Sequence, residues 1–286
     1  MPYAFDKIGD ARGTIAAGGT LVGSIPPGRV LQEIRPRFLD GGVALTEAQI
    51  VADVKRIKAE IDGVTKVDIS GRAGVMLANF YRPGSVGDGI VPIRFARPDM
   101  VLVQDQLGPA WGMSQSTRLT LTTEYDAAAA NIDGQETFYL STDPGDLPGD
   151  EVMGEHIETI EHDRSEAAIG WHELVINPAQ GRRLLALHVY DAALDIDQIR
   201  VWKNGRAGRQ TIIPDMPVEH WNRNRAYAGR EAEANWLHLD FDFRRYGVDA
   251  IPQDAPIVIG LYFGTAPGAF KYLTETAVGG AFGAPA

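Results

Sequence analysis

Residues 181–227, GRRLLALHVYDAALDIDQIRVWKNGRAGRQTIIPDMPVEHWNRNRAY, repeat an order of elements that the chain has already used at residues 28–81. In both places a Gly-Arg pair opens an apolar strand, and a connector ends at a Gln-Ile pair. The next strand then stops at a turn dipeptide, Asp62-Gly63 or Asn204-Gly205. Because Asp-Gly and Asn-Gly are strong hairpin signals, each copy is predicted to contain a hairpin.

A short helical segment follows each returning strand, at residues 73–81 and 217–227, and an alternating strand comes next. Residue identity between the copies is low, so the repeat is one of element order with loops of different length. The alternative is two unrelated β-rich stretches that share common turn residues.

The composition is that of a globular protein. The chain has 286 residues, enough for two domains, with a hydrophobic share of 44% and a charged share of 23%. It has no apolar run of about 18 residues, the length of a membrane span, and its start does not resemble a secretory signal. Cysteine is absent, which excludes disulfides, thiolate nucleophiles and thiolate metal sites.

The formal net charge of −11 bears on the choice of partner. Direct binding to a phosphate backbone needs clustered Lys and Arg that displace counterions. The chain is therefore not expected to bind nucleic acid directly.

Both halves of the chain consist mainly of short strand candidates separated by turn residues. Alternation of apolar and polar residues is clearest at residues 119–125, where Leu119, Leu121, Thr123 and Tyr125 face inward. One or two helical turns are expected at residues 46–54, with Thr46 as the cap. In the second half the strands are expected at 157–162, 171–176, 183–190, 198–203, 210–213, 235–243, 256–263 and 270–276.

Seven or eight strands in each half, with few helices, predict an all-β fold. We expect a double jelly roll: two eight-stranded β-sandwiches side by side, with a short helix in a loop of each. The strands LLALHVY and IVIGLYF are apolar on both faces, which predicts burial against a second layer on each side.

Residues 142–156, TDPGDLPGDEVMGEH, are acidic and broken by Pro and Gly, so they mark the best domain boundary. The expected division is an arm at 1–19, a first jelly roll at 20–145, a linker at 146–155, a second jelly roll at 156–277 and a tail at 278–286.

A family resemblance rests on short segments in a fixed order. In the first half they are the Gly-Arg strand leading to Ala48-Gln49-Ile50, the Ile61-Asp62-Gly63 turn, FARPDM at residues 95–100, the strand at 119–125 and DAAA at 126–129. In the second half they are the strands at 183–190, 199–205 and 237–243. In this order they resemble the double jelly-roll major capsid proteins of membrane-containing icosahedral bacteriophages, of the corticovirus type, over residues 20–276.

The resemblance implies a structural shell subunit, not an enzyme, that forms pseudo-hexagonal homotrimers in an icosahedral virion. It implies synthesis in the host cytoplasm, no required cofactor, and contacts with neighbouring trimers and with other capsid, vertex and membrane proteins. The internal membrane would be contacted indirectly, since anionic headgroups repel an acidic surface.

Several other residues are candidates for a metal, catalytic or phosphate-binding site. His238, Asp240 and Asp242 alternate along one strand and project from one face, where they would suit a metal or a glycosidase carboxylate pair. We interpret that face as an ordinary solvated one. His156 and His162 lack the helical spacing of a zinc protease and are expected to be strand residues. Residues 70–74, SGRAG, match no phosphate-binding or dinucleotide-binding pattern and are expected to be a loop and helix cap.

Four tryptophans lie in the second half: Trp171, Trp202, Trp221 and Trp236. Exposed aromatic rings form the platforms of sugar-binding sandwiches, so the alternative function is a sugar-binding or glycoside-hydrolysing β-sandwich. Their places inside strands and in a helical segment favour core or interface packing.

Calcium is the one ion that the sequence suggests, as an optional structural ion. Asp143, Asp146, Asp150 and Glu151 supply oxygen ligands in the linker, but without the fixed spacing of an EF-hand loop. A solvated acidic linker is therefore the favoured interpretation, and bound calcium is the alternative. Since like-charged subunits repel, calcium or raised salt is expected to strengthen assembly.

Overall fold

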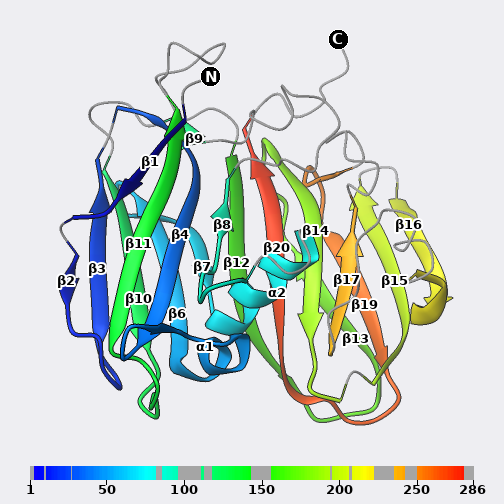
Figure 1. Cartoon of the computed structure of the whole chain (residues 1–286). Helices are drawn as coiled ribbons and strands as arrows, with labels where there is room; N and C mark the ends of the chain where they lie inside the picture. Colours follow the sequence, from blue (N-terminus) through cyan, green and yellow to red (C-terminus); the bar gives the residue numbers. More distant parts are fainter. Residues whose placement is uncertain are drawn as a thin grey trace. The chain divides into compact units, whose positions relative to one another are not determined.

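The computed structural model describes residues 3–9, 11–26, 28–81, 86–95, 111–112, 118–142, 156–193, 195–205, 208–221, 235–241 and 250–279. The chain divides into two compact units, Met1–Ile160 and Glu161–Ala286. Strands dominate both units, so the predicted all-β class is confirmed (Figure 1). Within the described residues, no helix is long and apolar enough to cross a membrane.

The first unit contains two short helices among its strands. Its elements are β1 (Tyr3–Lys7), β2 (Arg12–Gly13), β3 (Thr20–Ile25), β4 (Val30–Asp40), β5 (Val43–Ala44), α1 (Glu47–Asp53), β6 (Val54–Ile61), β7 (Val64–Ile69), α2 (Gly71–Tyr81), β8 (Ile93–Arg94), β9 (Trp111–Gly112), β10 (Leu119–Tyr125), β11 (Gly134–Thr142) and the start of β12 (His156–Glu166).

Two sheets form the sandwich of the first unit. One has the order β1-β11-β4-β5, with β8 and β9 also paired to β4. The other runs β12-β7-β6-β10-β3-β2, in which β12 is parallel to β7 and the remaining neighbours are antiparallel. The inward residues of β10 are buried and the alternate ones only partly so, as the alternation predicted.

Local sequence signals place the helices and the hairpin of the first unit. Thr46 caps α1 in a reciprocal capping box: its hydroxyl accepts from the backbone amide of Gln49, and the Gln49 side chain accepts from the Thr46 amide. Ser70 caps α2 by accepting from the Ala73 amide, which confirms the predicted cap. Asp62 and Gly63 adopt φ values of 49° and 80°, as the tight turn between β6 and β7 requires.

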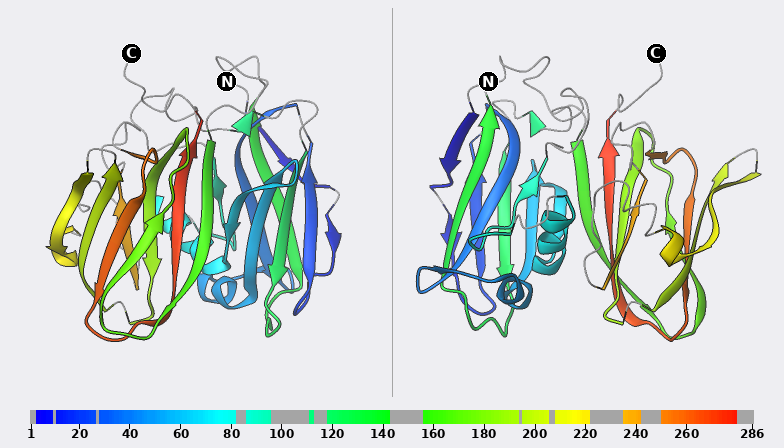
Figure 2. Two further views of the ribbon diagram at one scale, coloured as in Figure 1. Left: turned by 180° about the vertical axis from the view of Figure 1, so that it is seen from behind. Right: turned by 45° about the vertical axis from the view of Figure 1, so that its right-hand side comes forward.

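The second unit has two facing sheets. Its elements are the rest of β12, β13 (Gly170–Ile176), β14 (Arg182–Tyr190), β15 (Ile196–Gly205), β16 (Gly208–Pro217), β17 (Trp236–Asp240), β18 (Ile251–Pro252), β19 (Ile257–Phe263) and β20 (Gly268–Val278). One sheet has the order β13-β19-β15-β16, which the left-hand view of Figure 2 looks onto, and the other includes β17-β14-β20-β12.

The core of the second unit lies between these sheets and consists of aliphatic residues with a few phenylalanines. Strand β19 contributes every second residue, Ile257, Ile259, Leu261 and Phe263, all completely buried. Leu184, Leu187 and Val189 of β14 meet them from the other sheet. The alternation of strand side chains therefore fixes which residues of each strand point away from the core.

Several sequence predictions differ from the structure. The Gln-Ile pairs are not equivalent, because Gln49 and Ile50 lie in α1 whereas Gln198 and Ile199 lie in β15. The second turn is not Asn204-Gly205, because Asn204 pairs with Arg209 and Gly205 with Gly208, so both residues belong to the strand; residues 206–207 lie outside the described part of the chain. The order of strand, hairpin, helix and strand nevertheless recurs.

The element boundaries also shift. The division between units falls after Ile160, inside β12, and the predicted linker at 146–155 lies outside the described residues. Residues 1–19 were expected to be an arm, but β1 pairs with β11 and β2 with β3, so both strands extend sheets of the first unit. Of the second predicted helix, the structure describes helical residues 218–221 only.

A glycine substitution tests the hairpin. At Gly63 a methyl group would meet no atom within 4 Å, so Gly63→Ala isolates the cost of a left-handed backbone. We expect a loss of about 1 kcal/mol in the free energy of unfolding, measured by urea denaturation. Gly87→Ala is the control, because that glycine also has free space around it but no positive φ. Equal stabilities of the two variants would contradict this account of the turn.

Candidate functional site

The polar residues of β17 are buried, not solvated. His238 is completely buried and Asp240 nearly so, which makes the predicted solvated face wrong for these two residues; Asp242 lies outside the described residues. The reason lies in the pairing of β17 with β14, which sets His188 opposite His238. A polar residue thus meets a polar partner from a neighbouring strand, and alternation along one strand cannot reveal that partner.

His188 joins three strands through two hydrogen bonds. Its Nδ1 lies 2.7 Å from Nδ1 of His238, and its Nε2 lies 2.8 Å from Oε1 of Glu275 on β20. With Glu275 as the acceptor, a neutral His188 carries its proton on Nε2 and accepts at Nδ1 from His238. The group holds β17, β14 and β20 together and leaves no solvent-facing acid or base for a substrate.

The metal and glycosidase interpretations gain no support from this geometry. Among the residues that the structure describes, no group of three or more His, Asp or Glu is arranged to hold a metal ion. The calcium candidates Asp143, Asp146, Asp150 and Glu151 lie outside those residues. His156 and His162 both lie in β12, as predicted for strand residues.

Packing accounts for the tryptophans that the structure describes. Trp202 and Trp236 are buried, and Trp221 is half-buried and donates from Nε1 to the backbone oxygen of His238 at 2.6 Å. Trp171 lies on the face of β13 that points away from the core. Burial agrees with the predicted packing for Trp202 and Trp236, while an interface at Trp171 stays a prediction. Among the tryptophans that the structure describes, no row of exposed rings offers a sugar platform.

The outer face of the sheet β13-β19-β15-β16 carries a stack of rings and guanidinium groups, which we call the ladder face. The Arg200 guanidinium lies 4.0 Å from the ring centre of Trp171 and 5.0 Å from that of Trp202. The Arg209 guanidinium lies 4.0 Å from the ring centre of Trp202. Cations over aromatic rings are attracted by the negative ring faces. Exposed Val175 belongs to the same face.

A glycine makes room for this stack. A methyl group at Gly260 would come within 2.8 Å of Cγ and Nε of Arg200 and 3.2 Å of the Trp171 ring. Arg200 can therefore cross β19 only because residue 260 has no side chain. The second apolar face of IVIGLYF was expected to pack on another layer, but side chains of its own sheet cover it instead.

The outer face of the sheet β1-β11-β4-β5, like the ladder face, combines aromatic rings with cations. We call it the Phe5 face. Phe5 stacks on Phe138 with ring centres 5.3 Å apart, Arg35 lies 5.4 Å from the Phe5 ring and Lys7 lies 5.8 Å from the Phe138 ring. Phe5 itself is exposed. Sequence reasoning missed this face, although the pattern Tyr-Ala-Phe-Asp-Lys at the start already alternates like a strand.

The carboxylates of the Phe5 face are paired within it. Glu136 accepts from Lys7 at 2.7 Å and from Arg37 at 3.3 Å, and Glu33 pairs with Arg35 at 2.8 Å. The hydrogen bond from Lys7 lowers the pKa of the Glu136 carboxyl below its usual value, so it stays ionised.

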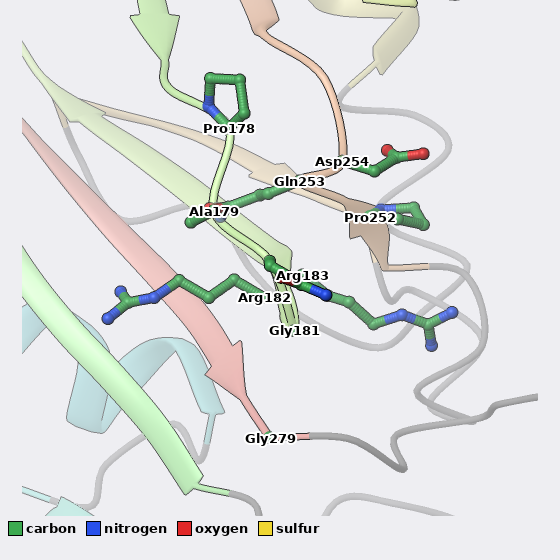
Figure 3. Close-up of a pocket in the computed structure, with 10 residues that line it drawn as sticks. Pro178, Ala179, Gly181, Arg182, Arg183, Pro252, Gln253, Asp254 and Gly279 are labelled. Atoms are coloured by element: carbon green, nitrogen blue, oxygen red, sulfur yellow. The ribbon is translucent and has the colours of Figure 1, made fainter.

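One pocket of about 460 Å³ lies in the second unit, lined by Pro178, Ala179, Gln180, Gly181, Arg182, Arg183, Pro252, Gln253, Asp254 and Gly279. Figure 3 shows the side chains of Arg182 and Arg183 extending in opposite directions, as neighbouring strand residues do. The two cations do not converge on a common anion, so the pocket has no evident small-molecule specificity.

The paired sheets in each unit define the class of protein: the chain has the double jelly-roll architecture of viral capsid proteins. The major capsid protein P2 from Bacteriophage PM2 is 16% identical, with a TM-score of 0.80 and 97% of each chain covered. The STIV MCP is 15% identical, with a TM-score of 0.65 and 97% of each chain covered. A chain of the PBCV-1 virus capsid is 12% identical, with a TM-score of 0.60 and 97% of this chain and 95% of that chain covered.

A protein-family match gives more specific information about the first unit than the structural comparisons do. Residues 10–138 match the family described as viral coat protein P2 N-terminal domain. No curated protein matches the chain. The predicted resemblance to double jelly-roll capsid proteins is thereby confirmed, and the family match supports the predicted role as a major capsid protein.

Substitution of Glu275 tests the structural role of the buried histidines. Glu275→Leu removes the acceptor for His188 and leaves a buried N–H without a hydrogen bond, so we expect a loss of about 1 to 3 kcal/mol in the free energy of unfolding. Glu275→Gln keeps an acceptor oxygen and should lose less. Urea denaturation of both variants decides the matter, and equal losses would show that the His188 hydrogen bond contributes nothing to stability.

Proposed function

We propose that this chain is a major capsid protein, a structural subunit of an icosahedral virion shell. The single observation that carries the proposal is the match of residues 10–138 to a viral coat protein family, on a chain that is similar to a double jelly-roll capsid protein over 97% of its length. The protein would be made in the host cytoplasm and function in the virion.

The role we propose is structural and not catalytic. Among the residues suggested by the sequence as acids, bases or ligands, His238 and Asp240 are buried, and His238 is hydrogen-bonded to His188. A shell subunit needs folded units and contact surfaces; the two compact units support the first requirement, and the second is part of the proposal.

We propose a homotrimer as the assembly unit, so that six jelly rolls give a pseudo-hexagonal capsomer. A ring closed by threefold symmetry needs two different surfaces on each subunit, and two unequal copies of one fold offer them. A permanent contact of this kind buries well over about 1,000 Å². Neighbouring trimers and other capsid, vertex and membrane proteins would complete the shell, with no direct contact to nucleic acid and only an indirect one to the membrane.

Sizing the purified protein tests the trimer. We expect light scattering at micromolar concentration in native salt to give the mass of three 31.0 kDa chains, and negative-stain images to show roughly hexagonal particles. A protein that stays monomeric under these conditions, or that binds polysaccharide as a monomer, would contradict the capsid proposal.

Charge sets the conditions for assembly. Three chains of −11 give a trimer of −33, and like charges of that size repel unless salt screens them or a divalent cation bridges carboxylates. We propose that calcium or raised salt strengthens assembly, with Asp143, Asp146, Asp150 and Glu151 among the candidate ligands.

Dialysis against a chelator at low ionic strength tests this proposal. We expect assemblies to dissociate and to re-form when calcium is restored. An equal ionic strength of sodium chloride is the control: recovery with calcium alone indicates a bound ion, and recovery with both indicates screening. Assemblies that stay intact in chelator at low ionic strength would show that apolar contacts dominate and that the charge argument is wrong.

A further inference from the structure

The ladder face and the Phe5 face differ in charge from the rest of this acidic chain. Together they carry six cations against four carboxylates, a net charge of +2. Because the whole chain carries −11, the rest of the chain carries −13. The cations are Lys7, Arg35, Arg37, Arg94, Arg200 and Arg209, and the carboxylates are Glu33, Glu136, Glu173 and Asp215. Two acidic copies approach each other with least repulsion through such surfaces.

We propose that the ladder face of one copy docks on the Phe5 face of a second copy. This inference rests on the proposed self-assembly and adds to it the two surfaces that meet. The occupant of each face is thus another molecule of the same chain, and the contact joins two different surfaces, which is the arrangement that closes a ring.

Composition supports an interface on both faces. Each has an exposed apolar side chain, Phe5 at 53% and Val175 at 52%, next to a stack of aromatic rings and arginines. Aromatic residues and Arg are enriched in interface cores, while single charged carboxylates and lysines are depleted. Packing Val175 and Phe5 against a partner would remove both from water.

The charges that remain in solvent favour unlike faces over like faces. On the ladder face Arg200 is enclosed by the rings, whereas Glu173 and Asp215 reach solvent, with side chains 49% and 60% exposed. These two carboxylates outnumber the one exposed cation of that face, Arg209. On the Phe5 face the more exposed groups are Lys7 and Arg35, at 53% and 37%, and their carboxylate partners are more covered. Exposed acids of one face would therefore meet exposed bases of the other, and two copies of one face would set like charges together.

Charge insertion on each face tests the contact. Val175→Glu and Phe5→Glu place a carboxylate where the partner would bury it, and each should raise the trimer dissociation constant by at least about tenfold. Val64→Glu is the matched control, because Val64 is 56% exposed in the β6–β7 hairpin and lies on neither face. Circular dichroism verifies that all three variants fold. Trimers of unchanged affinity in either face variant would overturn the proposal while leaving the capsid role intact, whereas a monomeric wild type would overturn the capsid role.

The absence of cysteine allows a test of which faces meet. The double variant Phe5→Cys with Val175→Cys, assembled and treated with a short bismaleimide, should give covalent dimers and trimers. Each single variant should give none, because a contact between unlike faces never brings two copies of one position together. Val64→Cys with Val175→Cys is the control. Cross-linked dimers from a single variant would show like faces in contact, and no cross-linking in the double variant would show that these faces do not meet; either result overturns the proposal.

Discussion

The structure of the second unit depends on the burial of a complete apolar face between two sheets. Ile257, Ile259, Leu261 and Phe263 of β19 are completely buried against Leu184, Leu187 and Val189 of β14. Removing this much apolar surface from water is the main favourable term that the fold has available, and it fixes the register of both strands. Once the register is fixed, every alternate residue must lie on the other side of its sheet.

The same register also sets which outward-facing residues lie next to each other. Because Arg200 of β15 lies opposite Gly260 of β19, its side chain can cross the neighbouring strand and lie between the rings of Trp171 and Trp202. The same pairing logic brings Phe5 of β1 beside Phe138 of β11 in the first unit. Core packing on one side of a sheet thus arranges the rings and guanidinium groups on the other side, which is the surface that the proposed assembly would use.

The buried polar group follows from sheet pairing in the same way. The group consists of His188, His238 and Glu275, which come from three strands that are neighbours in the sheet but distant in sequence. The sequence of each strand alone gives no sign of this group. Burial of the His188 ring is tolerated because both of its nitrogens have partners, one on His238 and one on Glu275. Residues that look like a metal or catalytic site along one strand therefore have a structural role once their partners on the neighbouring strands are known.

The sequence by itself determined the all-β class, the double jelly roll, the β6–β7 hairpin at Asp62-Gly63 and the capped helix at Thr46, because alternation, turn dipeptides and capping residues act over a few neighbouring positions. It also identified the capsid class through the order of its short segments. It failed where the outcome depends on pairing between distant strands. His238 was expected in solvent and is buried beside His188. Asn204 and Gly205 were expected to form a turn and are paired strand residues, and residues 3–7 join a sheet through β11. Only the tertiary structure decided these points, since the partner that buries a side chain or extends a sheet is not encoded near it in the chain.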